Sequence, residues 1–324
     1  MLGNFTYDNP TRLHFGPDAL ERLRDELPAF GPVVQLAYGG GSIKETGLYD
    51  QVVALLKECG KTVVDDGGVM PNPTAERLLE GRDRAREKGV DFILAVGGGS
   101  VIDTTKGAAA SLACEGVDFA TLQGSEILHA DLPPFIAVPT TAGTGSETTI
   151  AAVVTGSDHH KYAISDLCLI PRYAILDPVL TVGLPPHITA ETGMDALTHA
   201  VEAYLSRFYN TKQTRLLAEN AVVAIFTHLE RAYHDGASLP DRAAMLQASF
   251  DAGAAFTRAS VGNVHAIAHT LGGLYGVPHG LANAVLLPLV LEDYGKAAYP
   301  HLARLAALVG LKGESEESLA KAFI

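Results

Sequence analysis

Apolar and polar positions alternate with two different periods along the chain. In the N-terminal half, short β-branched apolar runs are each followed by a glycine or polar turn and then by a segment with helical spacing. Repetition of strand, turn and helix predicts a parallel sheet with helices packed on its faces. The predicted strands are 32–38, 61–66, 91–96, 133–140 and 173–178, and the predicted helices are 48–60, 75–89 and 97–114.

The C-terminal half has a different character. Pro185 and Pro186 interrupt the chain, β-branched runs become scarce, and alanine-rich segments with a helical period follow. We expect an α/β domain over residues 1–182 and an all-helical domain over residues 183–324. The clearest predicted helices of the second domain are 187–206, 214–233 and 241–259.

Composition narrows the class of protein. The chain has 324 residues, 47% of them hydrophobic and 19% charged, which is enough for two domains with substantial cores. A formal net charge of -13 argues against nonspecific binding of nucleic acid. The three cysteines, Cys59, Cys114 and Cys168, show no CxxC spacing, and neither a signal-peptide core nor an apolar run of about 18 residues occurs. We therefore expect a cytoplasmic protein that does not contact membranes.

Three small-residue turns follow predicted strands. Gly39–Ser42 and Gly97–Ser100 both read GGGS, and Val138–Thr148 is rich in glycine and hydroxyl side chains. Glycine lets a ligand approach the backbone closely, and the first turn of the next helix offers unpaired N–H groups to a phosphate. The same segments are also explained as tight turns and a surface loop. Two such turns in one α/β segment favour a nucleotide site.

Histidines in the helical half suggest a metal site. Asp195 and His199 are four residues apart, as are His265 and His269, so each pair shares one face of a helix. His279 follows a proline and is expected in a loop or at the start of a helix. Asp195, His199, His265 and His279 together offer one carboxylate and three imidazoles, which suit Fe(II) or Zn(II) better than Mg(II) or Ca(II). Taken singly, each histidine is better explained as a hydrogen-bonded structural residue than as a metal ligand.

The most distinctive segments occur in a fixed order and together cover most of the chain. They are GGVMPNPT (67–74), DFILAVGGGSVIDTTK (91–106), PTTAGTGSE (139–147), GMDALTHAVEAY (193–204) and VHAIAHTLGGLYGVPHG (264–280). In this order they resemble the iron-containing, or group III, alcohol dehydrogenase family, and within it the branch of NADPH-dependent butanol and aldehyde dehydrogenases.

The resemblance implies a Rossmann-like dinucleotide-binding domain, a helical metal-binding domain and an active site in the cleft between them. It implies that Asp195, His199, His265 and His279 bind the metal, Fe(II) with Zn(II) as the alternative, and that His269 moves a proton. Asp103 is placed near the nicotinamide and is assigned to catalysis with His269. The expected cofactor-binding residues are Gly40, Gly41, Ser42, Asn72, Gly97, Gly98, Gly99, Ser100, Asp103, Thr140, Thr141, Thr144 and Lys161.

The implied reaction is reversible hydride transfer between NADP(H) and a primary alcohol or aldehyde, with the metal as Lewis acid. Apolar residues at Ala151, Phe256 and Leu274 favour a small or medium substrate. NADP(H) is preferred over NAD(H) because no carboxylate occurs between Gly31 and Lys44, where NAD-using relatives tend to carry one. The absence of this carboxylate leaves room for the 2′-phosphate of NADP(H).

Three alternatives stay open at this point. Enzymes like maleylacetate reductase or dehydroquinate synthase share the plan, but their anionic substrates need more lysine and arginine near the site. A non-catalytic dinucleotide-binding protein is the third. We also expect a homodimer. The family usually continues with more helices beyond the segment that ends here in ESLAKAFI, so the helical domain is expected to be short or truncated.

Overall fold

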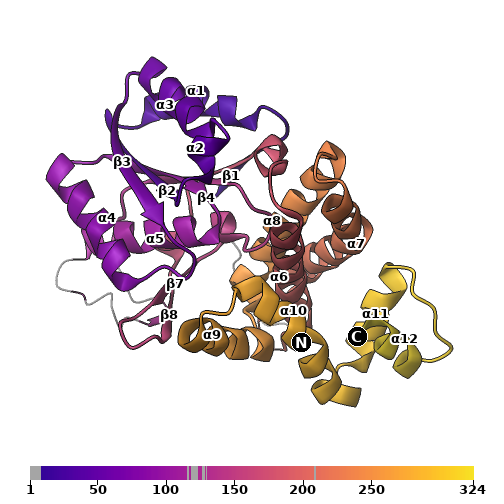
Figure 1. Cartoon of the computed structure of the whole chain (residues 1–324). Helices are drawn as coiled ribbons and strands as arrows, with labels where there is room; N and C mark the ends of the chain where they lie inside the picture. Colours follow the sequence, from indigo (N-terminus) through magenta and orange to yellow (C-terminus); the bar gives the residue numbers. More distant parts are fainter. Residues whose placement is uncertain (1–8, 115–116, 118–122, 126–127, 129, 208) are drawn as a thin grey trace. The chain divides into compact units, whose positions relative to one another are not determined.

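The computed structural model divides the chain into two compact units (Figure 1). It describes residues 9–114, 117, 123–125, 128, 130–207 and 209–324. Asn9–Thr141 and Ser146–Gly183 form the α/β unit, and Leu184–Ile324 form the helical unit together with Ala142–Gly145. The expected fold class, a parallel-sheet domain followed by an all-helical domain, is confirmed.

A six-stranded sheet is the centre of the α/β unit. Its strand order is β1-β9-β6-β4-β2-β3, and every neighbouring pair is parallel. Parallel strands place all their carboxyl ends at one edge, where ligands bind in open α/β sheets. The strands are β1 (Arg12–Phe15), β2 (Val33–Gly39), β3 (Thr62–Val69), β4 (Phe92–Gly97), β6 (Phe135–Pro139) and β9 (Tyr173–Leu176).

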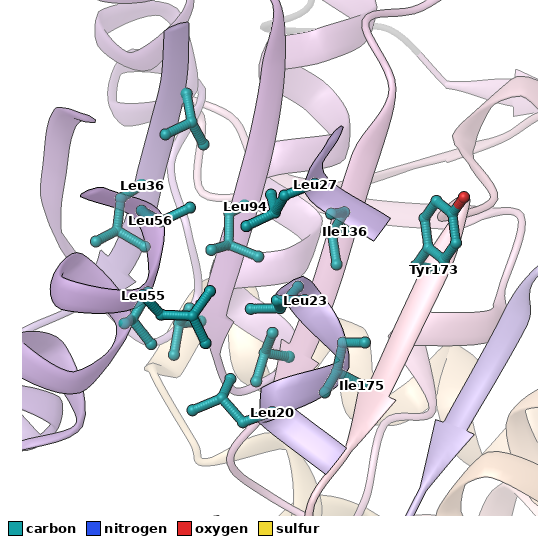
Figure 2. Packing of buried hydrophobic residues seen from close by; sticks show 14 of the residues in the cluster. Leu20, Leu23, Leu27, Leu36, Leu55, Leu56, Leu94, Ile136, Tyr173 and Ile175 are labelled. Atoms are coloured by element: carbon teal, nitrogen blue, oxygen red, sulfur yellow. The ribbon is translucent and has the colours of Figure 1, made fainter. Parts of the chain in front are cut away.

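Side chains that alternate along the strands supply two cores, one on each face. Leu36, Leu94 and Ile136 pack on one face with the helices before β2 and after it (Figure 2). Ile93 and Ala137 point to the other face, which helix α5 covers. The helices of this unit are α1 (Leu23–Glu26), α2 (Ser42–Glu45), α3 (Leu48–Glu58), α4 (Ala75–Lys88) and α5 (Gly99–Ala113).

Local sequence sets the ends of these helices. The Thr74 side chain accepts a hydrogen bond from the backbone N–H of Arg77 and so caps α4, which ends at Gly89 with a φ of 61°. Gly98 precedes α5 directly after β4, so the unpaired N–H groups of that helix lie at the carboxyl edge of the sheet.

A second, three-stranded sheet was not expected from the sequence. Its strands are β5 (Gly124–Ser125), β7 (Ala151–Thr155) and β8 (Lys161–Ser165), in the order β5-β8-β7. β7 and β8 pair antiparallel around the turn that contains His159, whose φ is 62°. Lys161, an expected cofactor residue, is the first residue of β8.

The helical unit consists, in its described residues, of long helices with short connections. Thr211 and Thr214 form a reciprocal capping box at the start of α7. None of the helices in the described part of the chain combines the length and apolar character needed to cross a bilayer. The helices are α6 (Pro186–Leu205), α7 (Lys212–His234), α8 (Leu239–Ala259), α9 (Asn263–Tyr275), α10 (His279–Tyr294), α11 (Tyr299–Leu308) and α12 (Glu316–Phe323).

Candidate functional site

Three helices of the helical unit bring the four expected metal ligands together. Asp195 and His199 lie one turn apart on α6, and both are buried. His265 lies in the first turn of α9, and His279 is the first residue of α10, as expected from the preceding proline. A Cβ atom on Gly280 would lie 2.2 Å from the backbone oxygen of Glu191, so glycine at this position lets α10 begin close against α6.

The four side chains form one compact donor set. One ligand atom from each residue lies within 4.8 Å of the others. Asp195 Oδ1 is 3.4 Å from His279 Nε2 and 3.7 Å from His265 Nε2. The rings of His199 and His265 stack with centroids 4.3 Å apart. A carboxylate and three imidazoles at these separations fit a borderline divalent cation such as Fe(II) or Zn(II).

Two further side chains support this donor set, and sequence reasoning missed both. Asn283 Nδ2 donates to Asp195 Oδ1 at 2.7 Å, and Glu202 Oε2 accepts from His265 Nδ1 at 2.6 Å. Asn283 is four residues beyond His279 on α10, and Glu202 is seven beyond Asp195 on α6. The same helical spacing that paired Asp195 with His199 could have identified them.

Electrostatics in the cluster favour an anionic Asp195 and a neutral His199. Burial alone raises the pKa of Asp195, but the charges of His199, His279 and His265 outweigh it and hold the pKa far below its usual range. Burial lowers the pKa of His199 to about 3. His265 is also buried, but its contacts with Asp195 and Glu202 raise its pKa to about 9. A proton and a cation therefore compete for His265.

His269 lies beside the donor set without belonging to it. Its ring centroid is 5.2 Å from that of His279 and 6.1 Å from that of His265. It is half-buried on α9, one turn beyond His265. Phe256 covers the other side of the cluster, where its ring stacks on His199 at 4.3 Å.

Most of the expected cofactor residues lie at the carboxyl edge of the large sheet. Thr140 N donates to Gly97 O at 3.1 Å, and a Cβ atom on Gly98 would lie 3.2 Å from Thr141 Oγ1. The ends of β4 and β6 are therefore in direct contact. Gly40, Gly41 and Ser42 follow β2, Asn72 follows β3, and Gly97–Ser100 link β4 to α5. Thr144 belongs to the short segment that groups with the helical unit.

Asp103 is held by this unit's own backbone and side chains. Its carboxylate accepts from Ser146 Oγ at 2.6 Å and from Val153 N at 3.0 Å. Burial raises the pKa of Asp103 above its usual value. This rise is partly opposed by the charges of Lys106 and Lys161 and by the hydrogen bonds from Ser146 and the Val153 amide. Asp103 thus ties α5 to the segment that follows β6.

Lys106, one turn further along α5, is fully buried. Its Nζ donates to Thr149 O, Thr149 Oγ1 and Ala151 O at 2.8 to 2.9 Å. Burial lowers its pKa to about 8 and raises that of the neighbouring Glu147 to about 7. Asp103, Lys106 and Glu147 thus form a second buried cluster of charged groups, besides the one around Asp195, and the Lys106 ammonium is its cation.

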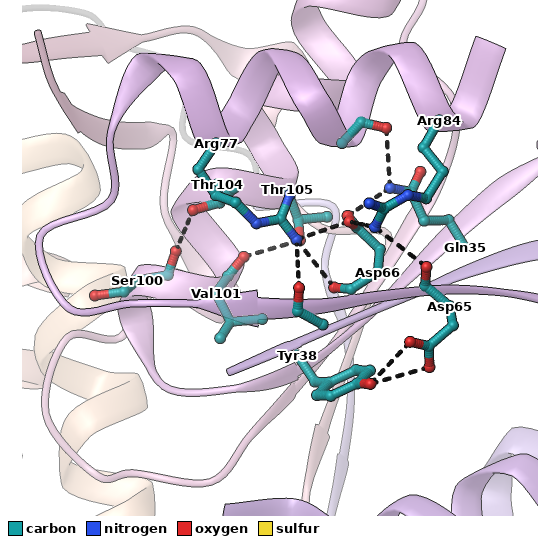
Figure 3. Close-up of polar contacts among 12 residues, drawn as sticks. Gln35, Tyr38, Asp65, Asp66, Arg77, Arg84, Ser100, Val101, Thr104 and Thr105 are labelled. Carbon is teal, nitrogen blue, oxygen red and sulfur yellow. Dashed lines mark hydrogen bonds and ion pairs between the residues drawn. The ribbon is translucent and has the colours of Figure 1, made fainter. Parts of the chain in front are cut away.

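Polar networks also brace the end of β3 (Figure 3). Asp66 is buried and accepts from Gln35 and from Arg77 at 2.6 and 2.7 Å, and it also bonds Arg84. The neighbouring Asp65 accepts from Tyr38 Oη at 2.9 Å. These bonds fix β2, β3 and α4 beneath the turn that begins at Gly40.

Lys44 lies beside that turn. Its Nζ is 4.9 Å from the ring centroid of Tyr38 and 4.8 Å from that of Tyr49, a cation–π arrangement. Its contact with Tyr38 raises its pKa, so the amine stays charged. The structure thus places one fixed positive charge near Gly40 and Ser42.

Both units of the chain match models of one known protein family. The family model for iron-containing alcohol dehydrogenases matches residues 10–178, and the C-terminal model of the same family matches residues 189–324. The chain belongs to the iron-containing alcohol dehydrogenase family. The expected family is confirmed, and the chain is an oxidoreductase of this NAD(P)-dependent iron type.

Several relatives within this family are substantially similar. The chain is 40% identical over 319 residues to 1,3-propanediol dehydrogenase of Citrobacter freundii, covering 97% of this chain and 81% of that protein. It is 34% identical to NADPH-dependent butanol dehydrogenase of Clostridium saccharobutylicum, covering 97% and 80%. A crystal structure of 1,3-propanediol oxidoreductase matches with a TM-score of 0.93 at 39% identity, over 99% of this chain and 85% of that one. These relatives favour a dehydrogenase over the lyase and non-catalytic alternatives.

Proposed function

We propose that this iron-type alcohol dehydrogenase interconverts a small or medium primary alcohol and its aldehyde with NADP(H), using one divalent cation held by Asp195, His199, His265 and His279. The observation that carries the proposal is the donor set itself, whose atoms lie within 4.8 Å of one another on three helices. The cation supplies Lewis acidity, which stabilises developing negative charge on the substrate oxygen. Fe(II) is the proposed native metal, because a substrate needs a fifth coordination position that zinc adopts less readily.

Side chains of the protein itself orient the substrate and move its hydroxyl proton. His269 lies next to the cluster, and an imidazole nitrogen there can pass the hydroxyl proton to solvent near neutral pH. Phe256, stacked on His199, covers one side of the cluster with an apolar surface. An apolar surface at this position favours a substrate with a short hydrocarbon chain. Names of relatives as butanol and propanediol dehydrogenases support the same class of substrate.

The glycine-rich edge of the sheet is the proposed dinucleotide site. Gly97–Ser100 place the N-terminal turn of α5 where its N–H groups can bind a pyrophosphate. Asn72, Thr140, Thr141 and Lys161 are assigned to the rest of the cofactor. In this proposal Asp103 acts near the nicotinamide by fixing the segment from Ser146 to Val153.

A panel of alcohols and aldehydes tests the reaction. Turnover is measured with NADPH and NADH in Fe(II)-loaded protein, in Zn(II)-loaded protein and in chelated protein. We expect primary alcohols of a few carbons to react with Fe(II)-loaded protein and the chelated protein to be inactive. Full activity of chelated protein contradicts the metal's role, and turnover restricted to carboxylated substrates contradicts the substrate class.

The preference for NADP(H) rests on Gly40, Ser42 and Lys44. A Cβ atom at Gly40 would lie 3.8 Å from the nearest atom, Met70 Sδ, so Gly40→Asp adds a carboxylate without a clash. We expect wild-type protein to favour NADPH over NADH by more than about tenfold in kcat/KM. Gly40→Asp lowers kcat/KM for NADPH selectively, because its charge repels a 2′-phosphate.

Gly183→Asp is the matched control for this substitution. A Cβ atom at Gly183 meets nothing within 4 Å, and the variant adds the same charge away from the turn. It should leave the ratio of the two kcat/KM values unchanged. Preference of wild-type protein for NADH, or an unchanged NADPH value in Gly40→Asp, contradicts this assignment.

The proposal also places the enzyme in the cytoplasm as a homodimer. All three cysteines, Cys59, Cys114 and Cys168, are free, which supports a reducing compartment. Sedimentation equilibrium gives the oligomeric state directly, and a monomer at micromolar concentration contradicts the dimer.

A further inference from the structure

We propose that Glu202 is a positioning residue for the metal centre, which fixes His265 with its hydrogen on Nδ1 and its Nε2 lone pair directed at the cation. The inference rests on the proposed metal site. Glu202 is buried on α6, and both of its carboxylate oxygens bond to the start of α9.

Helical spacing brings Glu202 to this place. Asp195, His199 and Glu202 are at positions i, i+4 and i+7 of α6 and therefore share one face. Asp195 and His199 face the donor set directly, whereas Glu202 lies one turn further along and faces the backbone of α9. One helix face thus supplies two candidate ligands and the group that orients a third.

The Glu202 carboxylate also caps the N-terminus of α9. Glu202 Oε1 accepts from Val264 N at 2.7 Å, in the first turn of α9. Gly262, the residue before the helix, has no side chain to do so, and a Cβ atom there would lie 2.9 Å from Glu202 Oε1. Glu202 therefore occupies the space where a local capping side chain would lie, and its charge favours the positive end of the helix.

The second oxygen determines the tautomer of His265. Glu202 Oε2 lies 2.6 Å from His265 Nδ1, and an ionised carboxylate can only accept a hydrogen bond. Nδ1 must therefore carry the hydrogen. The other nitrogen, Nε2, faces Asp195 Oδ1 at 3.7 Å and is the atom left to bind a metal.

The charge of Glu202 also matches the charge of the cation. Both carboxylates at this site, Asp195 and Glu202, are buried. Two buried negative charges are balanced by one divalent cation, and the three imidazoles stay neutral when they bind it.

Glu202→Gln tests the orientation most sharply. The amide oxygen can still accept from Val264 N, but its NH₂ group then faces His265 Nδ1 and requires a lone pair there. Zn(II) affinity, measured by competition with a chelator, should fall about 10–100-fold. Glu219→Gln is the matched control, because Glu219 accepts from Tyr204 and Arg304 on the same unit and holds no candidate ligand. Its Zn(II) affinity should equal that of wild-type protein.

A double-mutant cycle separates orientation from a general structural role. His265→Ala should bind Zn(II) only weakly, so the affinities in this background are measured by direct titration at raised Zn(II) concentration. If Glu202 acts through His265, Glu202→Gln should change this residual Zn(II) affinity much less than it changes the affinity of wild-type protein. An equal loss of affinity in both backgrounds overturns the proposal. So does unchanged affinity in the single variant.

Wild-type protein provides a test that does not depend on the folding of any variant. Histidine-selective ¹⁵N NMR of Zn(II)-loaded protein should show His265 protonated at Nδ1 and bound to the metal through Nε2. Metal coordination through Nδ1 overturns the proposal while leaving the metal site intact. Wild-type protein that binds no Zn(II) contradicts the metal site itself, and the two failures are therefore distinguishable.

Discussion

Each unit of this protein buries a cluster of charged groups, and the two clusters are balanced in different ways. In the α/β unit, Lys106 supplies the positive charge beside Asp103 and Glu147, and its ammonium donates three hydrogen bonds to Thr149 and Ala151. In the helical unit, Asp195 accepts from the neutral amide of Asn283, and Glu202 accepts from a backbone N–H and an imidazole.

This difference separates a structural cluster from one built to bind a cation. Buried charges are costly unless they are balanced, and Lys106 supplies a positive charge to the α/β cluster from within the chain itself. In the helical unit, Asp195 faces Nε2 of His265 and Nε2 of His279, which can themselves become metal ligands. The α/β cluster should therefore stabilise the fold without any ion, whereas the helical cluster should gain stability from a divalent metal.

Removal of the internal cation should have the largest effect on stability. Lys106→Met leaves buried carboxylates without a positive partner and should cost about 3–5 kcal/mol of the free energy of unfolding. Lys88→Met, which removes an exposed amine paired with Glu87, should cost less than about 0.5 kcal/mol. Urea unfolding at pH 7, below the pKa of about 8 for Lys106, measures both. The comparison breaks down if the two variants are equally stable, or if Lys106→Met loses bound metal while remaining folded.

Removal of the His269 imidazole, which lies beside the donor set, should affect turnover and leave metal binding intact. His269→Ala should keep one metal ion per chain but lose about 100-fold in kcat, because proton transfer from the substrate slows. Its pH–rate profile should change as well. Elemental analysis alongside steady-state kinetics checks both parts. Loss of metal equal to that of His265→Ala would show that His269 is a ligand.

The third prediction concerns pH and the α/β cluster. The pKa of Glu147 is raised by burial to about 7, so its ionised form destabilises the fold. As pH rises from about 4.5 to about 7, wild-type protein should lose stability relative to Glu147→Gln, by roughly 3 kcal/mol in all. Above about pH 7 the difference should stay constant.

Glu87→Gln is the control for this pH dependence. Lys88 holds the pKa of exposed Glu87 below its usual value, so the stability difference should not take the same direction. Chemical unfolding of all three proteins between pH 4.5 and pH 8 provides the data. A difference for Glu147→Gln that is independent of pH would show that Glu147 is not the titrating group.

The sequence predicted the parallel sheet and the long helices because their apolar periods are long and regular. β2 and α5, for example, lie within two residues of their expected bounds. The hairpin of β7 and β8 was missed because the stretch around His159 and His160 is polar and shows no strand pattern. Its strands pair across only five residues, too few to leave a clear period.

The candidate metal ligands could be predicted from the sequence. The buried residues around them, which hold the ligands in place, could not. Spacing of four residues placed Asp195 with His199, and residue type suggested that His265 and His279 complete a donor set with them. The resemblance to a family then assigned all four as metal ligands. Neither Glu202 nor Lys106 was expected to belong to a buried cluster, because glutamate and lysine are seldom buried. Their burial depends on contacts between separate helices and strands, which the local sequence does not determine.

Metal content per chain tests the central claim most directly. Protein reloaded with Fe(II) and freed of excess metal should contain about one ion per chain by elemental analysis. Lys106→Met, where it folds, should retain that ion, whereas His265→Ala and His279→Ala should lose it together with turnover, on the order of a thousand-fold. Wild-type protein that contains no stoichiometric metal and keeps full activity in excess chelator would contradict the account.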